Sequence, residues 1–169
     1  ESKMSKEQIE RFNKGQEIDY SIGISGLSRF RVNVFKQRGN IAAAYRRLPF
    51  DAPELEKLGL PPSVIDLSER RKGLVLITGA TGSGKSTTMA ALVKRLTEEL
   101  EGHILTIEDP IEYLYPHSKA QVNQREVGVD TESFASGLKS ALRQDPDVVV
   151  VGELRDPESM GAAISIAET

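Results

Sequence analysis

The middle of the chain contains the sequence Gly79-Ala80-Thr81-Gly82-Ser83-Gly84-Lys85-Ser86, which matches the pattern G-x-x-x-x-G-K-[ST] at every defined position. The glycines let backbone N–H groups turn inward around phosphate oxygens, and a helix that begins there adds the positive end of its dipole. Lys85 would reach the β- and γ-phosphates, while the Ser86 hydroxyl would hold Mg²⁺. We predict that this phosphate loop, extended by Thr87, binds a nucleoside triphosphate.

The sequence around the phosphate loop predicts an α/β fold. An apolar run precedes the loop, as expected of a strand buried on both faces of a parallel sheet, and a helical pattern follows it. The expected elements are a strand at 74–77, a helix at 85–101, strands at 104–107 and 120–123, a helix at 134–144, a strand at 148–151 and a helix at 157–168. Strands that alternate with helices indicate a parallel sheet.

Acidic residues follow two of the expected strands. The strand at 148–151 is followed by Gly152-Glu153, and the strand at 104–107 by Glu108-Asp109-Pro110-Ile111-Glu112. Ligands of open α/β sheets bind at the carboxyl ends of the strands, so we expect both groups near the phosphate loop. Glu153 is our candidate for holding the attacking water or the water shell of Mg²⁺. Any one of these carboxylates alone also fits a solvated surface, whereas two acidic strand ends beside a phosphate loop indicate a hydrolase.

The first 72 residues differ in charge from the rest of the chain. They carry 14 basic and 10 acidic side chains, whereas residues 73–169 carry 8 basic and 15 acidic ones, which gives the whole chain its net charge of −3. No acidic residue occurs between Asp19 and Asp51. That stretch contains Arg29, Arg31, Lys36, Arg38, Arg46 and Arg47. The asymmetry fits a solvated basic face and equally a surface that meets an anionic ligand or the acidic half.

The N-terminal residues predict a small antiparallel sheet. A helix is expected at residues 5–14, and alternating apolar and polar residues predict strands at 18–24, 29–34 and 41–48. These residues contain too little apolar material for a complete domain. Four prolines between residues 49 and 62 then indicate a linker, because proline interrupts helices and strands. We therefore divide the chain into an N-terminal domain at 1–48, a linker at 49–72 and a nucleotide-binding core at 73–169.

Composition excludes several classes of protein. The chain has no cysteine, which excludes disulfides and thiolate metal sites. No apolar run approaches the roughly 18 residues of a membrane-spanning helix, and the first residues do not show the basic-then-apolar pattern of a secretory signal. His103 and His117 lie on unrelated segments, so we expect no histidine metal site. The chain starts at Glu1 and stops part-way through its expected sheet, and we therefore expect it to be an excerpt of a longer protein.

Further motifs follow one another along the chain. The segment Thr106–Glu112 resembles the aspartate-rich box of the secretion and type IV pilus ATPases, and Leu142–Asp156 resembles the atypical Walker B segment of that family. The run Val122–Gly128 and the end Ala167–Thr169 resemble the branch of the family that retracts pili. The segment Arg29–Asn33 is similar to the N-terminal domain of the family. The resemblance therefore covers nearly the whole chain.

This resemblance implies a hexameric motor that hydrolyses ATP with Mg²⁺. Its fold would be a RecA-like P-loop ATPase core, incomplete here, preceded by the C-terminal part of a PAS-like α+β domain. Glu112 matches the glutamate of the acidic box and Glu153 the Walker B glutamate, and both are implied to serve hydrolysis together with Lys85. The family also has arginines that approach phosphate, some from a neighbouring subunit. Their counterparts here are Arg29, Arg31 and Arg46.

The resemblance also implies where the motor acts. It would drive pilus retraction at the cytoplasmic face of the inner membrane, on a membrane platform protein and without inserting into the bilayer. A pilus-extension or type II secretion ATPase is the alternative within the family. A nucleic-acid motor of the RecA or helicase type is a more distant alternative, disfavoured because the basic strands lack stacking aromatic residues. A nucleotide-binding regulator without turnover is disfavoured because Lys85, Ser86, Glu112 and Glu153 are all present.

Overall fold

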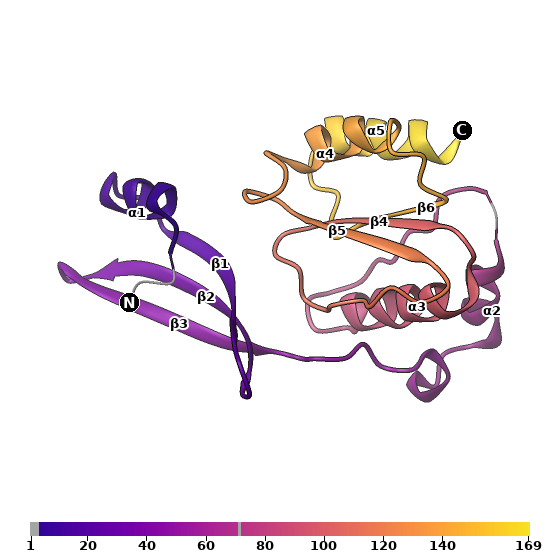
Figure 1. The fold of residues 1–169 in the computed structure, drawn as a ribbon, viewed down its shortest axis with the longest axis horizontal. Helices are drawn as coiled ribbons and strands as arrows, with labels where there is room; N and C mark the ends of the chain where they lie inside the picture. Colours follow the sequence, from indigo (N-terminus) through magenta and orange to yellow (C-terminus); the bar gives the residue numbers. More distant parts are fainter. Residues whose placement is uncertain (1–3, 71) are drawn as a thin grey trace. The chain divides into compact units, whose positions relative to one another are not determined.

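A computed structural model describes residues 4–70 and 72–169. Residues 1–3 of the first predicted domain and residue 71 of the predicted linker lie outside the described residues. The chain divides into two compact units, Glu1–Phe50 and Asp51–Thr169 (Figure 1). Each unit has its own sheet, antiparallel in the first and parallel in the second.

The first unit is a helix followed by a three-stranded antiparallel meander. Helix α1 spans Lys6–Asn13, and the strands are β1 (Ile18–Ile24), β2 (Ser28–Gln37) and β3 (Asn40–Leu48), in the order β1-β2-β3. Ser5 accepts a hydrogen bond from the Gln8 amide while the Gln8 side chain bonds back, a capping box that starts α1 as the sequence predicts. The core of this unit consists of Phe12, Ile18, Tyr20, Val32 and Val34.

The proline-rich segment folds with the second unit. It forms three short helical turns, η1 (Leu55–Leu58), α2 (Pro62–Ile65) and η2 (Asp66–Glu69), instead of an extended linker. Leu55 is buried against Ala91 and Leu92 of helix α3 (Lys85–Glu99). η1 ends at Gly59, which has φ 65°, and Pro62 is the first residue of α2. Leu58 and Leu60 pack against the same cluster as Leu55.

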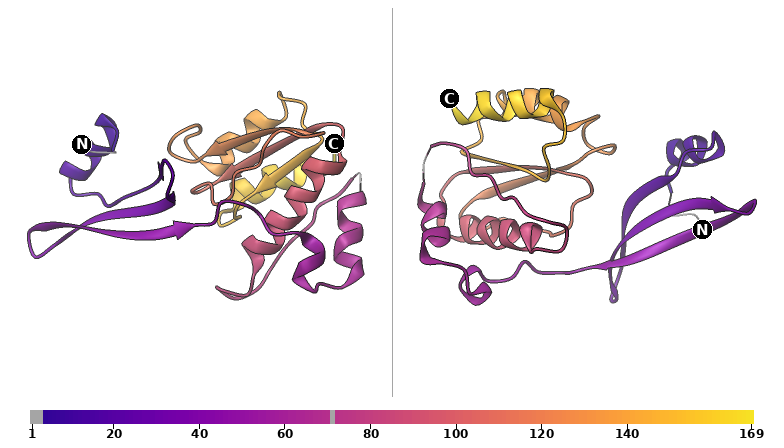
Figure 2. Two further views of the ribbon diagram at one scale, coloured as in Figure 1. Left: turned by 60° about the horizontal axis from the view of Figure 1, so that its bottom comes forward. Right: turned by 180° about the vertical axis from the view of Figure 1, so that it is seen from behind.

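The second unit is a three-layered α/β structure. Its strands β4 (His103–Glu108), β5 (Gln121–Glu126) and β6 (Val148–Val151) form a parallel sheet in the order β5-β4-β6. Helix α3 covers one face of this sheet, and helices α4 (Phe134–Ala141) and α5 (Pro157–Ala167) cover the other (Figures 1 and 2). Ile104 therefore packs with Val93 of α3, whereas Ile107 packs with Leu138 of α4.

The predicted strand at 74–77 is wrong for the structure described here. This segment forms no strand, and Leu74, Val75 and Leu76 are 46%, 47% and 63% exposed. A strand buried on both faces needs a hydrogen-bonded neighbour, and within residues 4–70 and 72–169 the sheet pairs only β5, β4 and β6. Ile77 alone packs inward, against the cluster around Leu92. Within the described residues, the apolar run therefore leads into the phosphate loop as an extended segment that is not hydrogen-bonded to the sheet.

Candidate nucleotide site

The phosphate loop connects the extended segment to α3 through glycines with positive φ. Gly79 has φ 152°, and a Cβ added there would lie 2.6 Å from the Ser83 hydroxyl oxygen. Gly84 has φ 94° and is the last residue before the helix. The Ser83 amide donates to the Ala80 carbonyl oxygen at 3.2 Å, which closes the turn between them. Glycine is therefore required at both ends of the loop, at one end for space and at the other for conformation.

The first turn of α3 lacks a side-chain cap. Gly84 stands at the N-cap position, no side chain accepts from the first amides, and the first turn contains no acidic residue. In contrast, Ser5, Ser133 and Asp156 cap α1, α4 and α5 through side-chain oxygens. The first four N–H groups of a helix have no partner within it and attract an anion. The first amides of α3 are therefore available to an anion such as phosphate.

Lys85 and Ser86 follow the loop directly and lie in the first turn of α3. The Lys85 ammonium donates to the Ala80 carbonyl oxygen at 2.9 Å, so it folds back over the loop. Ser86 is exposed on the first turn of α3, and Thr87 beside it is half-buried. The Ser86 hydroxyl and a nearby carboxylate would suit Mg²⁺, which prefers oxygen donors and keeps several waters. These residues therefore fit a nucleotide bound with Mg²⁺.

Helix α3 runs antiparallel to the strands it covers. It ends three residues before β4 begins, and the Thr97 carbonyl in its last turns accepts a hydrogen bond from the Ala120 amide just before β5. The end of α3 therefore lies at the amino ends of the strands. Its first turn, with the phosphate loop, lies toward their carboxyl ends (Figure 1). This is the edge where we predicted the acidic groups.

The two predicted acidic groups meet at this edge. The Gly152 amide after β6 donates to the Ile107 carbonyl oxygen at 2.8 Å, and Gly152 lies against Glu108 at the end of β4. Glu153 follows at once, its carboxylate half-buried and paired with the exposed Arg155 at 2.8 Å. The carboxylate of Glu108 accepts a hydrogen bond from the Glu112 backbone. The structure therefore brings Glu108, Glu112 and the Gly152-Glu153 turn to one side of the sheet.

Glu108 is a buried carboxylate, only 6% exposed. Burial raises the pKa of its carboxyl group, opposed by hydrogen bonds from the Thr106 hydroxyl and the Gln124 side chain, and the charge of Glu112 raises it further. The Thr106 oxygen lies 2.7 Å from the Glu108 carboxylate. Glu108 therefore stabilises this edge of the sheet from the protein interior, while Glu153 is the more accessible acid.

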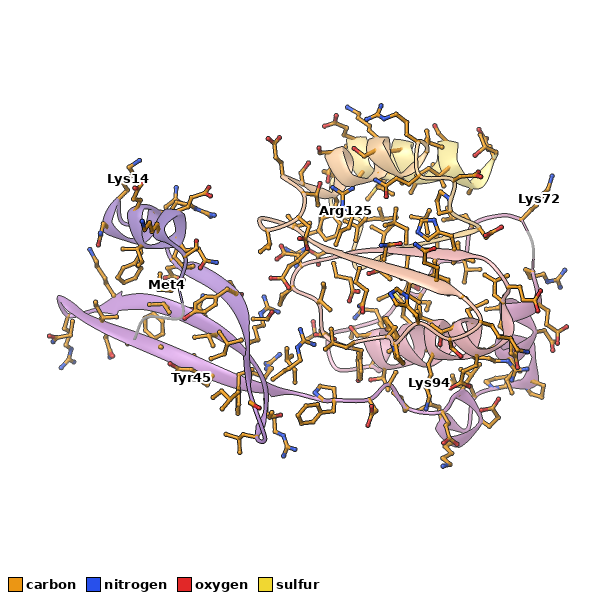
Figure 3. All side chains as sticks on the ribbon, viewed as in Figure 1. Met4, Lys14, Tyr45, Lys72, Lys94 and Arg125 are labelled. Carbon is orange, nitrogen blue, oxygen red and sulfur yellow. The ribbon has the colours of Figure 1, made fainter. Side chains whose placement is uncertain are left out.

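Sequence reasoning missed two polar residues at the same edge. Glu126, at the end of β5 and opposite Glu108 in the sheet, is 8% exposed and accepts a hydrogen bond from the Ile111 amide at 3.1 Å. Gln124, two residues earlier, bonds to the loop that follows Glu108. Arg125 between them donates to the Asp130 carbonyl oxygen at 2.8 Å (Figure 3). The signal available was the polar run at 123–126, which is unusual for a buried parallel strand.

The three predicted arginines share one face of the first unit's sheet. Arg31 is paired with Arg46 in the register of β2 and β3, and Arg29 lies two residues before Arg31 on β2. Side chains at alternate positions point to the same side of a strand, and this side is opposite to the core residue Val32. Arg31 also forms an ion pair with Asp19 of β1 at 2.6 Å. Which of these arginines contacts phosphate stays a prediction.

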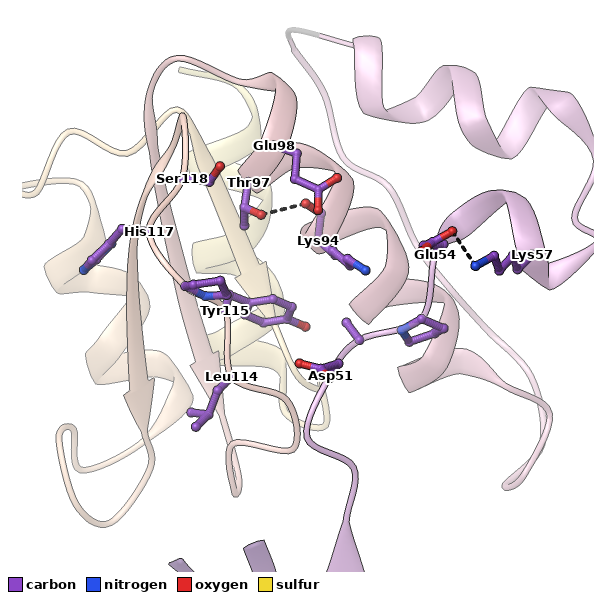
Figure 4. A pocket seen from close by; sticks show the side chains of 13 residues that line it. Asp51, Glu54, Lys57, Lys94, Thr97, Glu98, Leu114, Tyr115, His117 and Ser118 are labelled. Carbon is purple, nitrogen blue, oxygen red and sulfur yellow. Dashed lines mark hydrogen bonds and ion pairs between the residues drawn. The ribbon is translucent and has the colours of Figure 1, made fainter. Parts of the chain in front are cut away.

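A cavity of about 640 Å³ lies in the second unit, away from the phosphate loop. It is open to solvent and is lined by residues 51–54, by the last turns of α3 and by the loop 114–118 (Figure 4). Lys94, Glu98 and Tyr115 line it, so it lies toward the amino ends of the strands. The edge that carries the phosphate loop and this cavity are therefore separate features.

Two features are absent from residues 4–70 and 72–169. None of their helices is long and apolar enough to cross a membrane. No three histidine or acidic side chains among them converge as a metal site. His103 instead bonds to Asn123 at 2.9 Å and to the Gln144 carbonyl at 3.2 Å, joining the segments at the amino ends of the strands.

Comparison with known proteins identifies the family. The family model described as "Type II/IV secretion system protein" matches residues 14–169. The chain belongs to this family. The twitching motility protein of Neisseria gonorrhoeae is 46% identical over 168 residues, covering 99% of this chain and 45% of that protein. The type II secretion system protein E of Klebsiella pneumoniae is 48% identical over 121 residues, covering 69% of this chain and 23% of that protein.

A solved structure of another family member has the same fold. The crystal structure of the pilus retraction motor PilT with bound ADP superposes with a TM-score of 0.95 at 52% sequence identity, covering 98% of this chain and 48% of that one. The chain spans about half the length of the Neisseria protein and of PilT, and about a quarter of the Klebsiella protein. These matches confirm the resemblance to the secretion and type IV pilus ATPases and a mixed α/β fold.

Proposed function

We propose that this chain is part of a motor ATPase that hydrolyses ATP to drive retraction of a type IV pilus. In this proposal residues 73–169 belong to a RecA-like core, and residues 1–48 to a PAS-like domain that precedes it. The observation that carries the proposal is the phosphate loop at the uncapped start of α3, which faces the acidic edge of the sheet. Similarity to the retraction motor PilT, solved with ADP, supports it.

The residues of the site divide the chemistry between them. The N–H groups of residues 79–87 would surround the phosphates, and Lys85 would turn from the Ala80 carbonyl to the β- and γ-phosphates. Mg²⁺, held by the Ser86 hydroxyl, would neutralise charge that develops on the phosphates. Glu153 would hold the attacking water or the water shell of the metal. Glu112 would act as a second acidic group from the neighbouring strand end.

The basic face of the first unit supplies the remaining charge in this proposal. Arg29, Arg31 and Arg46 share one side of that sheet, so a single phosphate could meet more than one of them. An arginine brought to the γ-phosphate accelerates phosphoryl transfer by about 10³–10⁵ in other nucleotide hydrolases. We propose that these arginines approach the nucleotide within a homo-hexamer, some from a neighbouring subunit.

The proposed partner is an inner-membrane platform protein of the pilus. The motor would act on it at the cytoplasmic face of the membrane, without insertion into the bilayer and without nucleic acid. A pilus-extension or type II secretion ATPase is the second candidate. Greater coverage by the twitching motility protein, 99% of this chain against 69% for the type II secretion protein, favours retraction.

ATP hydrolysis by the full-length protein tests this function. We expect Glu153→Gln to bind ATP like the parent and to lose at least about 100-fold in turnover, since the acid contributes to the reaction and not to binding. Glu158→Gln is the matched control, because Glu158 is exposed and forms an ion pair with the equally exposed Lys139. Normal turnover by Glu153→Gln would remove this residue from the mechanism.

The direction of force needs a cellular assay. The parent gene should restore twitching to piliated cells that lack their own retraction ATPase, and the Glu153→Gln gene should not. Restoration of pilus extension or of type II secretion instead would favour the second candidate. Stimulation of turnover by DNA would point to a nucleic-acid motor.

A further inference from the structure

The run Val122–Gly128 was singled out in the sequence only as a family signature. In the structure its first half is the end of β5, where Gln124 and Glu126 occupy alternate positions and so share one face of the strand. Buried Val122 lies on the same face. A strand of this kind would ordinarily continue with apolar residues. Two polar side chains at this place therefore call for a physical reason.

Both side chains bond to the loop that carries Glu112. The Ile111 amide donates to the Glu126 carboxylate at 3.1 Å. The Gln124 side chain donates to the Tyr113 carbonyl oxygen at 2.8 Å and accepts from the Tyr115 amide at 2.9 Å. The three anchored residues alternate along the loop. Glu112 therefore lies between two residues whose backbones are tied to β5.

The same network reaches the end of β4. Gln124 also donates to the Glu108 carboxylate at 3.2 Å, and this carboxylate accepts from the Thr106 hydroxyl and from the Glu112 backbone. Glu126 is itself fixed, because its amide donates to the Asp130 carboxylate at 2.8 Å. Ile111 and Tyr113, on either side of Glu112, are thus bonded to Glu126 and Gln124. These two residues are themselves hydrogen-bonded to Asp130 and Glu108.

We propose that Gln124 and Glu126 are positioning residues, which hold the loop 109–115 so that Glu112 stays at the nucleotide-binding edge. The inference rests on the proposed function, since it gives Glu112 a part in hydrolysis. It assigns the pair Gln124 and Glu126 on β5 a task that an apolar strand end could not perform, because the loop amides and the Tyr113 carbonyl need polar partners. A displacement of about 1 Å can cost about 100-fold in rate, so such a clamp has a kinetic effect.

Methionine and glutamine variants of the full-length protein test the clamp. Glu126→Met keeps the length of the side chain but removes both acceptor oxygens, and we expect kcat to fall about 10- to 100-fold while the KM for ATP changes less than about 3-fold. Glu126→Gln retains an oxygen for the Ile111 amide and should keep kcat within about 3-fold of the parent. Rescue by glutamine would separate the hydrogen bond from the charge.

Gln124→Met is a second variant at a half-buried position, in case Glu126→Met fails to fold. Its matched control is Gln121→Met at the exposed start of the same strand, where the side chain donates only to Asn123 at 3.3 Å. We expect Gln124→Met to lose kcat as Glu126→Met does, and Gln121→Met to match the parent. In the background of Glu112→Gln, neither clamp variant should cause a further loss, because both act through Glu112.

Hydrogen exchange keeps the test independent of catalysis. Exchange of the Ile111 and Tyr115 amides should accelerate in Glu126→Met and Gln124→Met, while the amides of α3 exchange as in the parent. Unchanged exchange, normal kcat in both methionine variants, or losses that add in full to those of Glu112→Gln would overturn the clamp. A parent protein that never hydrolyses ATP, yet shows the faster loop exchange in these variants, would overturn the proposed function and retain the clamp.

Discussion

Helices α3 and α5 begin in opposite ways. Asp156 caps α5, its carboxylate accepting from the Ser159 amide at 2.8 Å, and the first turn continues with Pro157 and Glu158. Gly84 precedes α3, no side chain caps it, and no acid stands in its first turn. Both helices cover the same sheet, so packing does not explain the difference. A helix that serves only the fold satisfies its own first amides, whereas one that serves an anion leaves them available.

The largest expected effect comes from giving α3 a start like that of α5. Gly84→Asp places a carboxylate where the phosphates would lie, and two unit charges about 4 Å apart near a protein surface repel by about 4 kcal/mol. We expect ATP binding to the full-length protein to weaken by about 100- to 1000-fold, as measured by calorimetry.

Gly84→Asn controls for the backbone and the added bulk, since both residues replace a glycine at φ 94°. It should weaken binding less than Gly84→Asp, and the difference should shrink at high salt. Equal losses in the two variants, independent of salt, would show that strain rather than charge is responsible.

Removing the loop lysine should have the next largest effect. Lys85→Ala deletes the cation that we assign to the β- and γ-phosphates, and we expect at least about 100-fold loss of ATP turnover. In the structure this ammonium donates to the Ala80 carbonyl oxygen in a hydrogen bond that is exposed to solvent. Because water can replace an exposed partner, the thermal stability of the nucleotide-free protein should change little.

Lys94→Ala, on the same helix but beside the cavity, is the control and should hydrolyse ATP like the parent. Turnover by Lys85→Ala within about 3-fold of the parent would contradict the role of the phosphate loop in catalysis. A large drop in thermal stability would instead give Lys85 a structural task, like that of the caps of α1, α4 and α5.

The difference between the helix starts could be predicted in part from the sequence. The sequence predicted helices at 5–14 and 157–168 and a helix start directly after the phosphate loop. These predictions rest on local patterns, and α1, α5 and α3 are found there in the structure. The segment 74–77 was misjudged because apolar character records a preference for burial, while a strand also needs a partner in hydrogen-bonding distance. Local pattern contains no information on that partner.

The acidic edge shows the same limit. Glu108, Glu112 and Glu153 were found from the rule that strand ends gather at one edge, and the structure gathers them there. Gln124 and Glu126 were not, because their partners lie 9 to 15 residues away in the chain. Contacts within three or four residues follow from sequence spacing, whereas contacts across a loop follow from the register of β4 with β5.

Loss of an ordinary cap should have a smaller effect than any change in the phosphate loop. The Ser133 hydroxyl accepts from the Ser136 amide at 3.1 Å at the start of α4, and Ser133→Ala should cost about 1 kcal/mol. For a domain of 150–250 residues this lowers Tm by about 2–4 °C. Ser136→Ala in the same turn is the control. ATP turnover should be unchanged in both variants. A loss of turnover in Ser133→Ala alone would contradict the view that this cap serves only the fold.

The smallest effect is the pH dependence of the α5 cap. Hydrogen bonds from the Ser159 amide and hydroxyl lower the pKa of Asp156 below its usual 3.8. Because the folded pKa lies below the unfolded one, the stabilisation is complete above pH 3.8 and is lost as the pH falls through the folded value. Asp156→Ala should therefore lower Tm slightly at pH 7, and its difference from the parent should narrow below pH 3.8. Asp156→Asn, which can still cap but does not titrate, should show no such narrowing relative to Asp156→Ala. The start of α3 has no titrating cap. The affinity for ATP should therefore depend on pH in the same way in the parent and in Asp156→Ala. A pH dependence of the ATP affinity that Asp156→Ala abolishes would contradict the separate roles of the two helix starts.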